Sequence, residues 1–201
     1  MDGAKIQLSK EEKELISNSK WILTKNDILL KVNAMLTGIM ADQTEWLFSR
    51  QLQLPAALAS HSPKISRGEN YHGLPWMMLD QPRIFGKPDT FAIRIFFWWG
   101  HFFSITLQLE GSYKTSYQHT LSHATLADRN YLVAVTGNRW LHHPADDHYR
   151  AVSLMNADSF TNHIKDHPFV KLTSVTPLSD WEQIREKMSE EFSFLMGMLI
   201  T

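Results

Sequence analysis

The sequence predicts an α+β fold, in which helices at both ends of the chain flank a mainly antiparallel sheet. Residues 91–110 are apolar at alternate positions, a pattern typical of a β-hairpin. Apolar residues recur at helical spacing near both ends of the chain. The other strand-like segments are separated by short helices, which disfavours a doubly wound parallel sheet.

The predicted hairpin, Phe91–Glu110, forms the middle of the sheet. Successive side chains of a strand point to opposite faces, and the odd-numbered residues on both sides of Gly100 are apolar. A three-residue turn at 99–101 keeps odd residues opposite odd residues, with Gly100 where a positive φ is often needed. We therefore predict the cross-strand pairs Phe97–Phe103, Ile95–Ile105, Ile93–Leu107 and Phe91–Leu109.

The even-numbered face of the hairpin is mixed and carries Arg94 between two isoleucines. A charge in mid-strand is rarely buried without a partner, and Arg forms bidentate pairs with carboxylates or binds anionic ligands. We predict a ligand-binding pocket on this face, formed by Arg94, Trp98, Phe96, Phe102, Asp80 and Arg83. The alternative is a structural role, in which Arg94 pairs with an acid such as Asp80 or Glu69 and a helix covers the aromatic residues.

Both ends of the chain are predicted to be helical. One capping box starts at Ser9 and another at Ser179, whereas Thr24 is expected to cap a second helix that ends near Arg50. Frequent proline and glycine after residue 54 indicate irregular structure. We expect one domain with four parts: a helical part at 1–54, an irregular segment at 55–88 that wraps the sheet, the sheet with short helices at 89–176, and a C-terminal helix at 179–201. Further strands are expected at 131–136, 149–155 and 169–175, and short helices at 113–123 and 158–165, the latter capped by Asp158.

Composition restricts the classes of partner. The chain has 201 residues, a net charge of −1 and scattered basic residues, whereas nucleic-acid binding needs clustered Lys and Arg. No run approaches the roughly 18 apolar residues of a membrane span, and the first residues do not resemble a signal peptide. We therefore expect a cytoplasmic protein that binds neither nucleic acid nor membrane. The absence of cysteine excludes disulfides and thiolate metal sites.

Two segments carry a resemblance to other proteins. They are PKISRGENYHGLPWMMLDQPRIFGKPDTFAIRIFFWWGHFFSITLQLEG at 63–111 and RNYLVAVTGNRWLHHPADDHYRAV at 129–152. Together they cover about a third of the chain and are similar to stretches of uncharacterised bacterial proteins. The resemblance implies a bacterial, single-domain protein; it implies no activity, cofactor or catalytic residue.

Histidine and aspartate are concentrated after residue 141. Imidazole and carboxylate groups bind zinc, iron or manganese, so we predict a candidate divalent-metal site at His142, His143, Asp146, Asp147 and His148. Because Pro144 indicates a turn, the alternative is a solvated turn between two strands. A second pair, His119 and His123, lies four residues apart on an expected helix, with ordinary surface histidines as the alternative.

The end of the final helix, Phe192–Ile200, is apolar on more than one face. Such a helix is either buried within the chain or forms a homodimer interface. No phosphate-binding loop, dinucleotide fingerprint or nucleophile elbow occurs in the sequence. The favoured interpretation is a non-enzymatic ligand-binding or protein-interaction domain. The alternatives are a metal-dependent hydrolase or oxygenase that uses the His and Asp stretch, and a purely structural scaffold protein.

Overall fold

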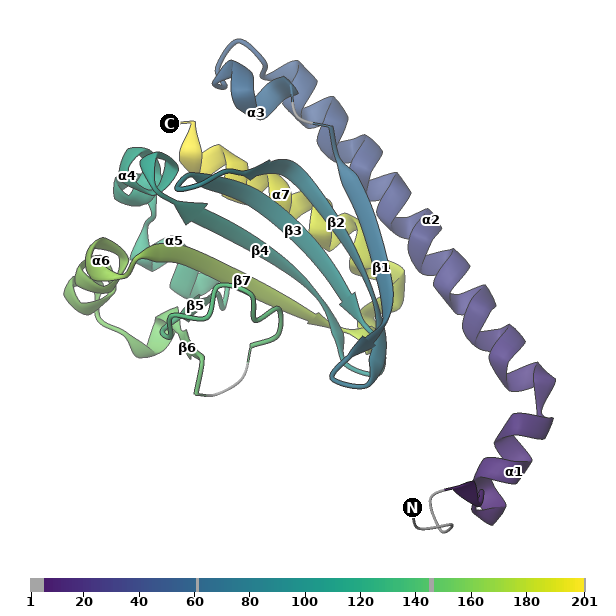
Figure 1. Ribbon diagram of the computed structural model, residues 1–201. Helices are drawn as coiled ribbons and strands as arrows, with labels where there is room; N and C mark the ends of the chain where they lie inside the picture. Colours follow the sequence, from purple (N-terminus) through teal and green to yellow (C-terminus); the bar gives the residue numbers. More distant parts are fainter. Residues whose placement is uncertain (1–5, 61, 145–146, 201) are drawn as a thin grey trace. The chain divides into compact units, whose positions relative to one another are not determined.

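The structure is a computed structural model that describes residues 6–60, 62–144 and 147–200 (Figure 1). The chain divides into two compact units, residues 1–35 and residues 36–201. The expectation of one domain stays a prediction. No helix in the described part of the chain is long and apolar enough to cross a membrane.

The first unit contains α1 (Lys10–Ser17) and the beginning of α2 (Ser19–Ser49). The capping box at Ser9 is confirmed, because Ser9 Oγ accepts from the Glu12 amide at 3.1 Å and the Ser9 amide donates to Glu12 Oε2 at 2.6 Å. The predicted cap at Thr24 is wrong. Asn18 Oδ1 already accepts from the Trp21 amide at 3.2 Å, so α2 begins six residues earlier than a cap at Thr24 would place it. The Thr24 hydroxyl instead donates to the carbonyl of Lys20 within the helix, as Thr often does in mid-helix.

The second unit contains a seven-stranded sheet in the order β1-β2-β3-β4-β7-β5-β6. Every pair of neighbouring strands is antiparallel, and the prediction of an α+β fold with helices at both termini is confirmed. The strands are β1 (Lys64–Tyr71), β2 (Leu74–Phe85), β3 (Thr90–Trp98), β4 (Phe102–Glu110), β5 (Leu132–Ala134), β6 (Tyr149–Ala151) and β7 (Phe169–Pro177).

The register predicted for the central hairpin, β3–β4, is confirmed. Phe97 lies opposite Phe103, and the three other predicted pairs are also found. Gly100 in the turn has a φ of +75°, a conformation that glycine adopts without strain. The odd-numbered face is therefore apolar throughout the hairpin, and the even-numbered face is mixed.

The irregular segment predicted at 55–88 is wrong. After α3 (Ala56–Ser60), this stretch forms the hairpin β1–β2. Proline is tolerated here because the register of β2 shifts between Asp80 and Arg83, and such an irregularity leaves Pro82 free of the regular ladder.

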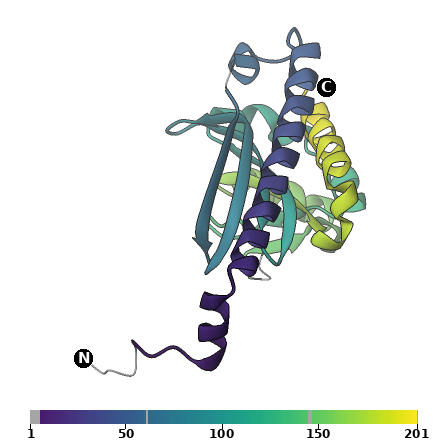
Figure 2. The same ribbon diagram turned by 90° about the vertical axis from the view of Figure 1, so that its right-hand side faces the viewer.

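Helix α7 (Ile184–Leu199) lies against the odd-numbered face of the sheet (Figures 1 and 2). The second half of α2 packs beside it, with the rings of Trp46 and Phe192 5.6 Å apart. The apolar residues that recur at helical spacing along α7 are each at most 5% exposed: Ile184, Met188, Phe192, Leu195 and Leu199. The capping box at Ser179 is wrong, because Ser179 lies within η4 (Leu178–Gln183) and its hydroxyl bonds to Asp180.

Within the chain, every residue of the apolar end Phe192–Ile200 is buried or half-buried. These side chains therefore have packing partners in the same chain, which matches the first of the two interpretations of this segment. The homodimer stays a prediction.

Short helices precede and follow β5 and β6 in the part of the chain between β4 and β7: α4 (Ser112–Tyr117), η2 (Gln118–Thr120), α5 (His123–Asp128), η3 (Val152–Leu154) and α6 (Ala157–Asp166). The single helix expected at 113–123 is wrong, so His119 and His123 do not share a helix face. His123 Nε2 lies 2.7 Å from the carbonyl oxygen of Met155. Asn156, not Asp158, caps α6 by accepting from the Ser159 amide at 2.8 Å.

Candidate functional site: a buried polar strip

A strip of polar side chains crosses the even-numbered face of the sheet. The register places Asp80 of β2, Arg94 of β3, Thr106 of β4 and Thr173 of β7 in one row. The next row contains Gln108 and Lys171. These six residues are the polar strip. Apart from Arg94, whose side chain is 11% exposed, each is at most 5% exposed.

Arg94 forms a bidentate ion pair at one end of the strip. Its Nε donates to Asp80 Oδ1 at 2.7 Å and its Nη2 to Asp80 Oδ2 at 3.1 Å. Its Nη1 lies 3.1 Å from His142 Nδ1. The pairing with Asp80 is the structural alternative that the sequence left open for Arg94.

The strip is covered by residues 138–144, the covering segment, and not by a helix. The described residues between Ala134 and Tyr149 contain neither helix nor strand. Lys171 Nζ donates to the carbonyl oxygens of Arg139, at 3.1 Å, and Leu141. Arg139 also forms an ion pair with Glu110 at 2.6 Å. The segment is therefore attached to β4 and β7 by polar contacts.

A second attachment joins the covering segment to β1. The hydroxyl of Tyr71 accepts from the His142 amide at 2.9 Å and lies 2.7 Å from His143 Nδ1. The rings of His143 and His72 are 4.7 Å apart. This contact joins β1, at one edge of the sheet, to the segment between β5 and β6 at the other edge.

Burial sets the charge of the groups in this site. Burial, with Arg94 nearby, lowers the pKa of Lys171 from 10.5 to about 7. Burial also lowers the pKa of His142 to about 3, with further contributions from Arg94, Lys171 and His143. His142 is therefore neutral near pH 7, and its Nδ1 accepts from the Arg94 guanidinium.

The aromatic residues predicted for the pocket pack against one another. Phe96 and Trp98 are 1% and 7% exposed, and Phe102 packs against the same cluster. Trp98 stacks on His101 with ring centroids 3.7 Å apart. Arg83 lies beyond the register shift, opposite Ala92. These residues border the strip and do not form an open wall.

The metal-site residues point to different partners. His142 contacts Arg94, His143 contacts Tyr71, and His148 Nδ1 lies 3.1 Å from Thr136 Oγ1. Asp147 lies 3.6 Å from His148 Nε2, while Asp146 is outside the described residues. Among the residues that the structure describes, no group of three His, Cys, Asp or Glu side chains could hold a metal ion. The metal site stays a prediction.

Sequence reasoning missed Lys171, Tyr71 and Tyr149. Lys171 shows the same pattern that identified Arg94, a charged residue in the middle of an apolar strand, FVKLTSVTP. The roles of Tyr71 and Tyr149 had no local signal. Their hydroxyls bond to the covering segment, Tyr149 to the carbonyl of Leu141 at 3.4 Å.

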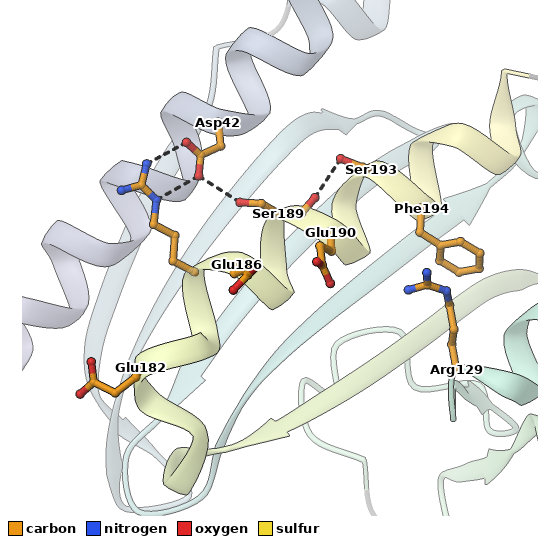
Figure 3. Close-up of a pocket in the computed structure, with 9 residues that line it drawn as sticks. Asp42, Arg129, Glu182, Glu186, Ser189, Glu190, Ser193 and Phe194 are labelled. Carbon is orange, nitrogen blue, oxygen red and sulfur yellow. Dashed lines mark hydrogen bonds and ion pairs between the residues drawn. The ribbon is translucent and has the colours of Figure 1, made fainter.

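A shallow groove of about 950 Å³ follows α7 on the opposite side of the sheet (Figure 3). Asp42 of α2 and Arg185 of α7 form a bidentate pair there at 2.8 and 3.0 Å. The Arg185 side chain is 57% exposed. The groove therefore contains a solvent-exposed counterpart of the buried Arg94–Asp80 pair.

The chain matches no known protein family, no curated protein and no solved structure. The resemblance to uncharacterised bacterial proteins therefore stays a prediction. The fold and the site define an α+β protein with a buried polar strip beneath an irregular covering segment. Its function has to be argued from that strip.

Proposed function

We propose that the protein is a non-enzymatic ligand-binding protein, whose ligand occupies the polar strip when the covering segment lifts. The observation that carries this proposal is the burial of a continuous polar row, Asp80 to Thr173, beneath residues that form neither helix nor strand. Binding sites frequently combine a rigid sheet with an irregular segment.

Stability alone does not account for the strip. A buried ion pair can often be replaced by apolar residues of similar volume with no loss of stability, because removing two charges from water is costly. The odd-numbered face of the same strands is built in that way, with Ile93, Ile95 and Leu107 at most 1% exposed. The polar residues on the other face therefore support a role in recognition.

The attachments of the covering segment suit reversible opening. They are mainly hydrogen bonds and ion pairs, beside ring contacts of His142 with Phe96 and of His143 with Trp98, and a hydrogen bond exchanged for water costs only about 1 kcal/mol net. Few apolar side chains are involved: Trp140 is 61% exposed and Leu141 is half-buried. Segments with few buried apolar contacts open most readily.

The test compares two double variants, each of which removes one bidentate Arg–Asp pair. Asp80→Leu with Arg94→Met alters the strip, whereas Asp42→Leu with Arg185→Met alters the groove along α7. Ligand-detected NMR would screen small carboxylic acids, amino acids, sugar phosphates, nucleotides and neutral polyols. We expect compounds that bind the wild type and the groove variant but not the strip variant.

Two results would oppose the proposal. One is a panel in which nothing binds the wild type. The other is a set of bound compounds that the strip variant retains while the groove variant loses them. Circular dichroism of both variants controls for loss of the fold.

A further inference from the structure

We infer that the cavity between η2 and α6 binds a small one-ring carboxylate, of which benzoate is the simplest example. The cavity has a volume of about 230 Å³ and shares no residue with the polar strip. It lies among the short helices near the end of the sheet where β4 ends and β7 begins (Figure 1). The inference is therefore independent of the proposed function and goes beyond it.

The floor of the cavity is apolar and limits the size of the ligand. Leu121, Phe160 and Ile164 line it and are 8%, 1% and 4% exposed. An apolar cavity of about 150 Å³ holds one benzene molecule, whereas pockets for drug-sized ligands have about 300–1,000 Å³. The cavity between η2 and α6 therefore has room for one ring with a small substituent, and a two-ring compound exceeds it.

The rim of the cavity presents hydrogen-bond donors. Gln118 lines the cavity, and its Oε1 is buried without a hydrogen-bond partner among the described residues. The side-chain amide thus turns its oxygen inward, and Nε2 is the end that a ligand in the cavity can reach. An amide nitrogen offers two N–H donors and no acceptor. A ligand group that meets Gln118 therefore has to be an acceptor.

Charge selects a carboxylate among the possible acceptors. Lys165 lines the rim and is exposed. None of the described Asp and Glu side chains lines the cavity or forms an ion pair with Lys165. Its ammonium group has three N–H donors and no acceptor. A carboxylate accepts from both the Gln118 amide and the Lys165 ammonium group in charge-assisted hydrogen bonds, which are stronger than neutral ones.

The test follows the methyl signals of Leu121 and Ile164 in NMR spectra of the isotope-labelled protein during titrations. The probes are benzoate, benzamide and benzylamine, which share one ring and differ in charge, and naphthoate, which has two rings. We expect benzoate to bind with a dissociation constant of roughly 1 mM. Benzamide should bind roughly twofold to fivefold more weakly, because an exposed ion pair contributes little. Benzylamine should bind more weakly still, because its ammonium group meets Lys165, and naphthoate should not bind.

Two glutamine variants locate the effect. Gln118→Glu keeps the size of the side chain and replaces its N–H donors by a carboxylate, so benzylamine should then bind more tightly than benzoate. Gln183→Glu is the matched control, because Gln183 is also an exposed-end residue of a short 3-10 helix, η4, but lies outside the cavity. It should keep the wild-type order of the probes. If Gln118→Glu does not fold, the wild-type order still decides.

The possible outcomes test each part of the inference. Methyl signals that benzoate leaves unshifted at about ten times the expected dissociation constant would overturn the site. Benzamide or benzylamine that binds the wild type as tightly as benzoate would overturn the carboxylate, and naphthoate that binds as tightly would overturn the one-ring limit. A wild-type order that survives in folded Gln118→Glu would overturn the role of Gln118.

The same titration separates the cavity from the polar strip. The double variant Asp80→Leu with Arg94→Met alters the strip and leaves the residues of the cavity unchanged. Benzoate should therefore shift the methyl signals of Leu121 and Ile164 in this variant as it does in the wild type. If the shifts disappear in the folded double variant, benzoate binds in the strip, and the inference about the cavity is wrong.

Discussion

Replacing Arg94 by alanine tests whether the ion pair of the polar strip is truly buried. The change leaves the Asp80 carboxylate, on a side chain that is 8% exposed, without the two N–H donors at 2.7 and 3.1 Å. It also removes the donor to His142 Nδ1. Breaking one partner out of a buried pair costs about 3–5 kcal/mol. Since small proteins are stable by about 5–15 kcal/mol, the loss should be large.

The double variant Asp80→Leu with Arg94→Met should recover most of this loss. Both charges are then absent, and apolar side chains of similar volume fill the space, which is often neutral or stabilising. Urea unfolding of the wild type, both single variants and the double variant measures the coupling between the two residues. Each curve gives an unfolding free energy and a slope, and an unchanged slope indicates an unchanged extent of unfolding.

Arg185→Ala is the matched control for Arg94→Ala. It breaks an equally bidentate pair with Asp42, but one in which water solvates the remaining carboxylate, so little stability should be lost. The reasoning is refuted if Arg94→Ala costs no more than Arg185→Ala. It is also refuted if the double strip variant is as unstable as Arg94→Ala.

Three further predictions concern stability. The pKa of Lys171 is lowered to about 7 in the folded protein, so between pH 7 and 9 the unfolded chain binds more protons at this residue than the folded one. The unfolding free energy, measured by urea titration, should therefore rise by up to about 3 kcal/mol over that range. An equal rise in Lys171→Met would contradict this. The pKa of His142 is lowered to about 3, so the unfolding free energy should fall by about 2 kcal/mol as the pH drops from 6.5 to 5. In His142→Gln the side chain still accepts from Arg94 but does not titrate, so the unfolding free energy should fall by about 2 kcal/mol less in the same assay. Gly197→Ala should raise the unfolding free energy by about 0.5–1 kcal/mol, because no neighbouring atom lies within 4 Å of the added Cβ. Gly111→Ala should lower the unfolding free energy, because Gly111 has a φ of +63°. A lower thermal unfolding temperature for Gly197→Ala than for Gly111→Ala would contradict both.

Local patterns predicted the centre of the sheet. Alternating polarity determines which residues share a face, so the register of β3–β4 and the mixed face around Arg94 could both be read from the sequence. The Asp80–Arg94 pair followed from the same logic, because a charge in mid-strand needs a partner. The hairpin β1–β2 was missed because prolines suggested a loop, whereas a register shift beside Pro82 accommodates proline within a long strand.

The site beneath the covering segment depends on contacts between distant residues. Tyr71 and His143 are 72 residues apart in the chain, and Lys171 is 30 residues from Leu141. No local pattern encodes such contacts, because they arise only when the strand order places β7 beside β4 and β5. The histidine-rich stretch was therefore recognised as chemically distinctive, but its attachment to Tyr71 and Lys171 could not be foreseen.

The most direct test of the proposed ligand site is chemical-shift mapping. Backbone amide spectra of the isotope-labelled protein would be recorded while the tightest-binding compound of the panel is added. The account predicts that the shifted amides belong to the polar strip, around Arg94, Thr106 and Lys171, and to the covering segment. Shifts confined to the groove of Asp42 and Arg185, with the strip unchanged, would contradict it.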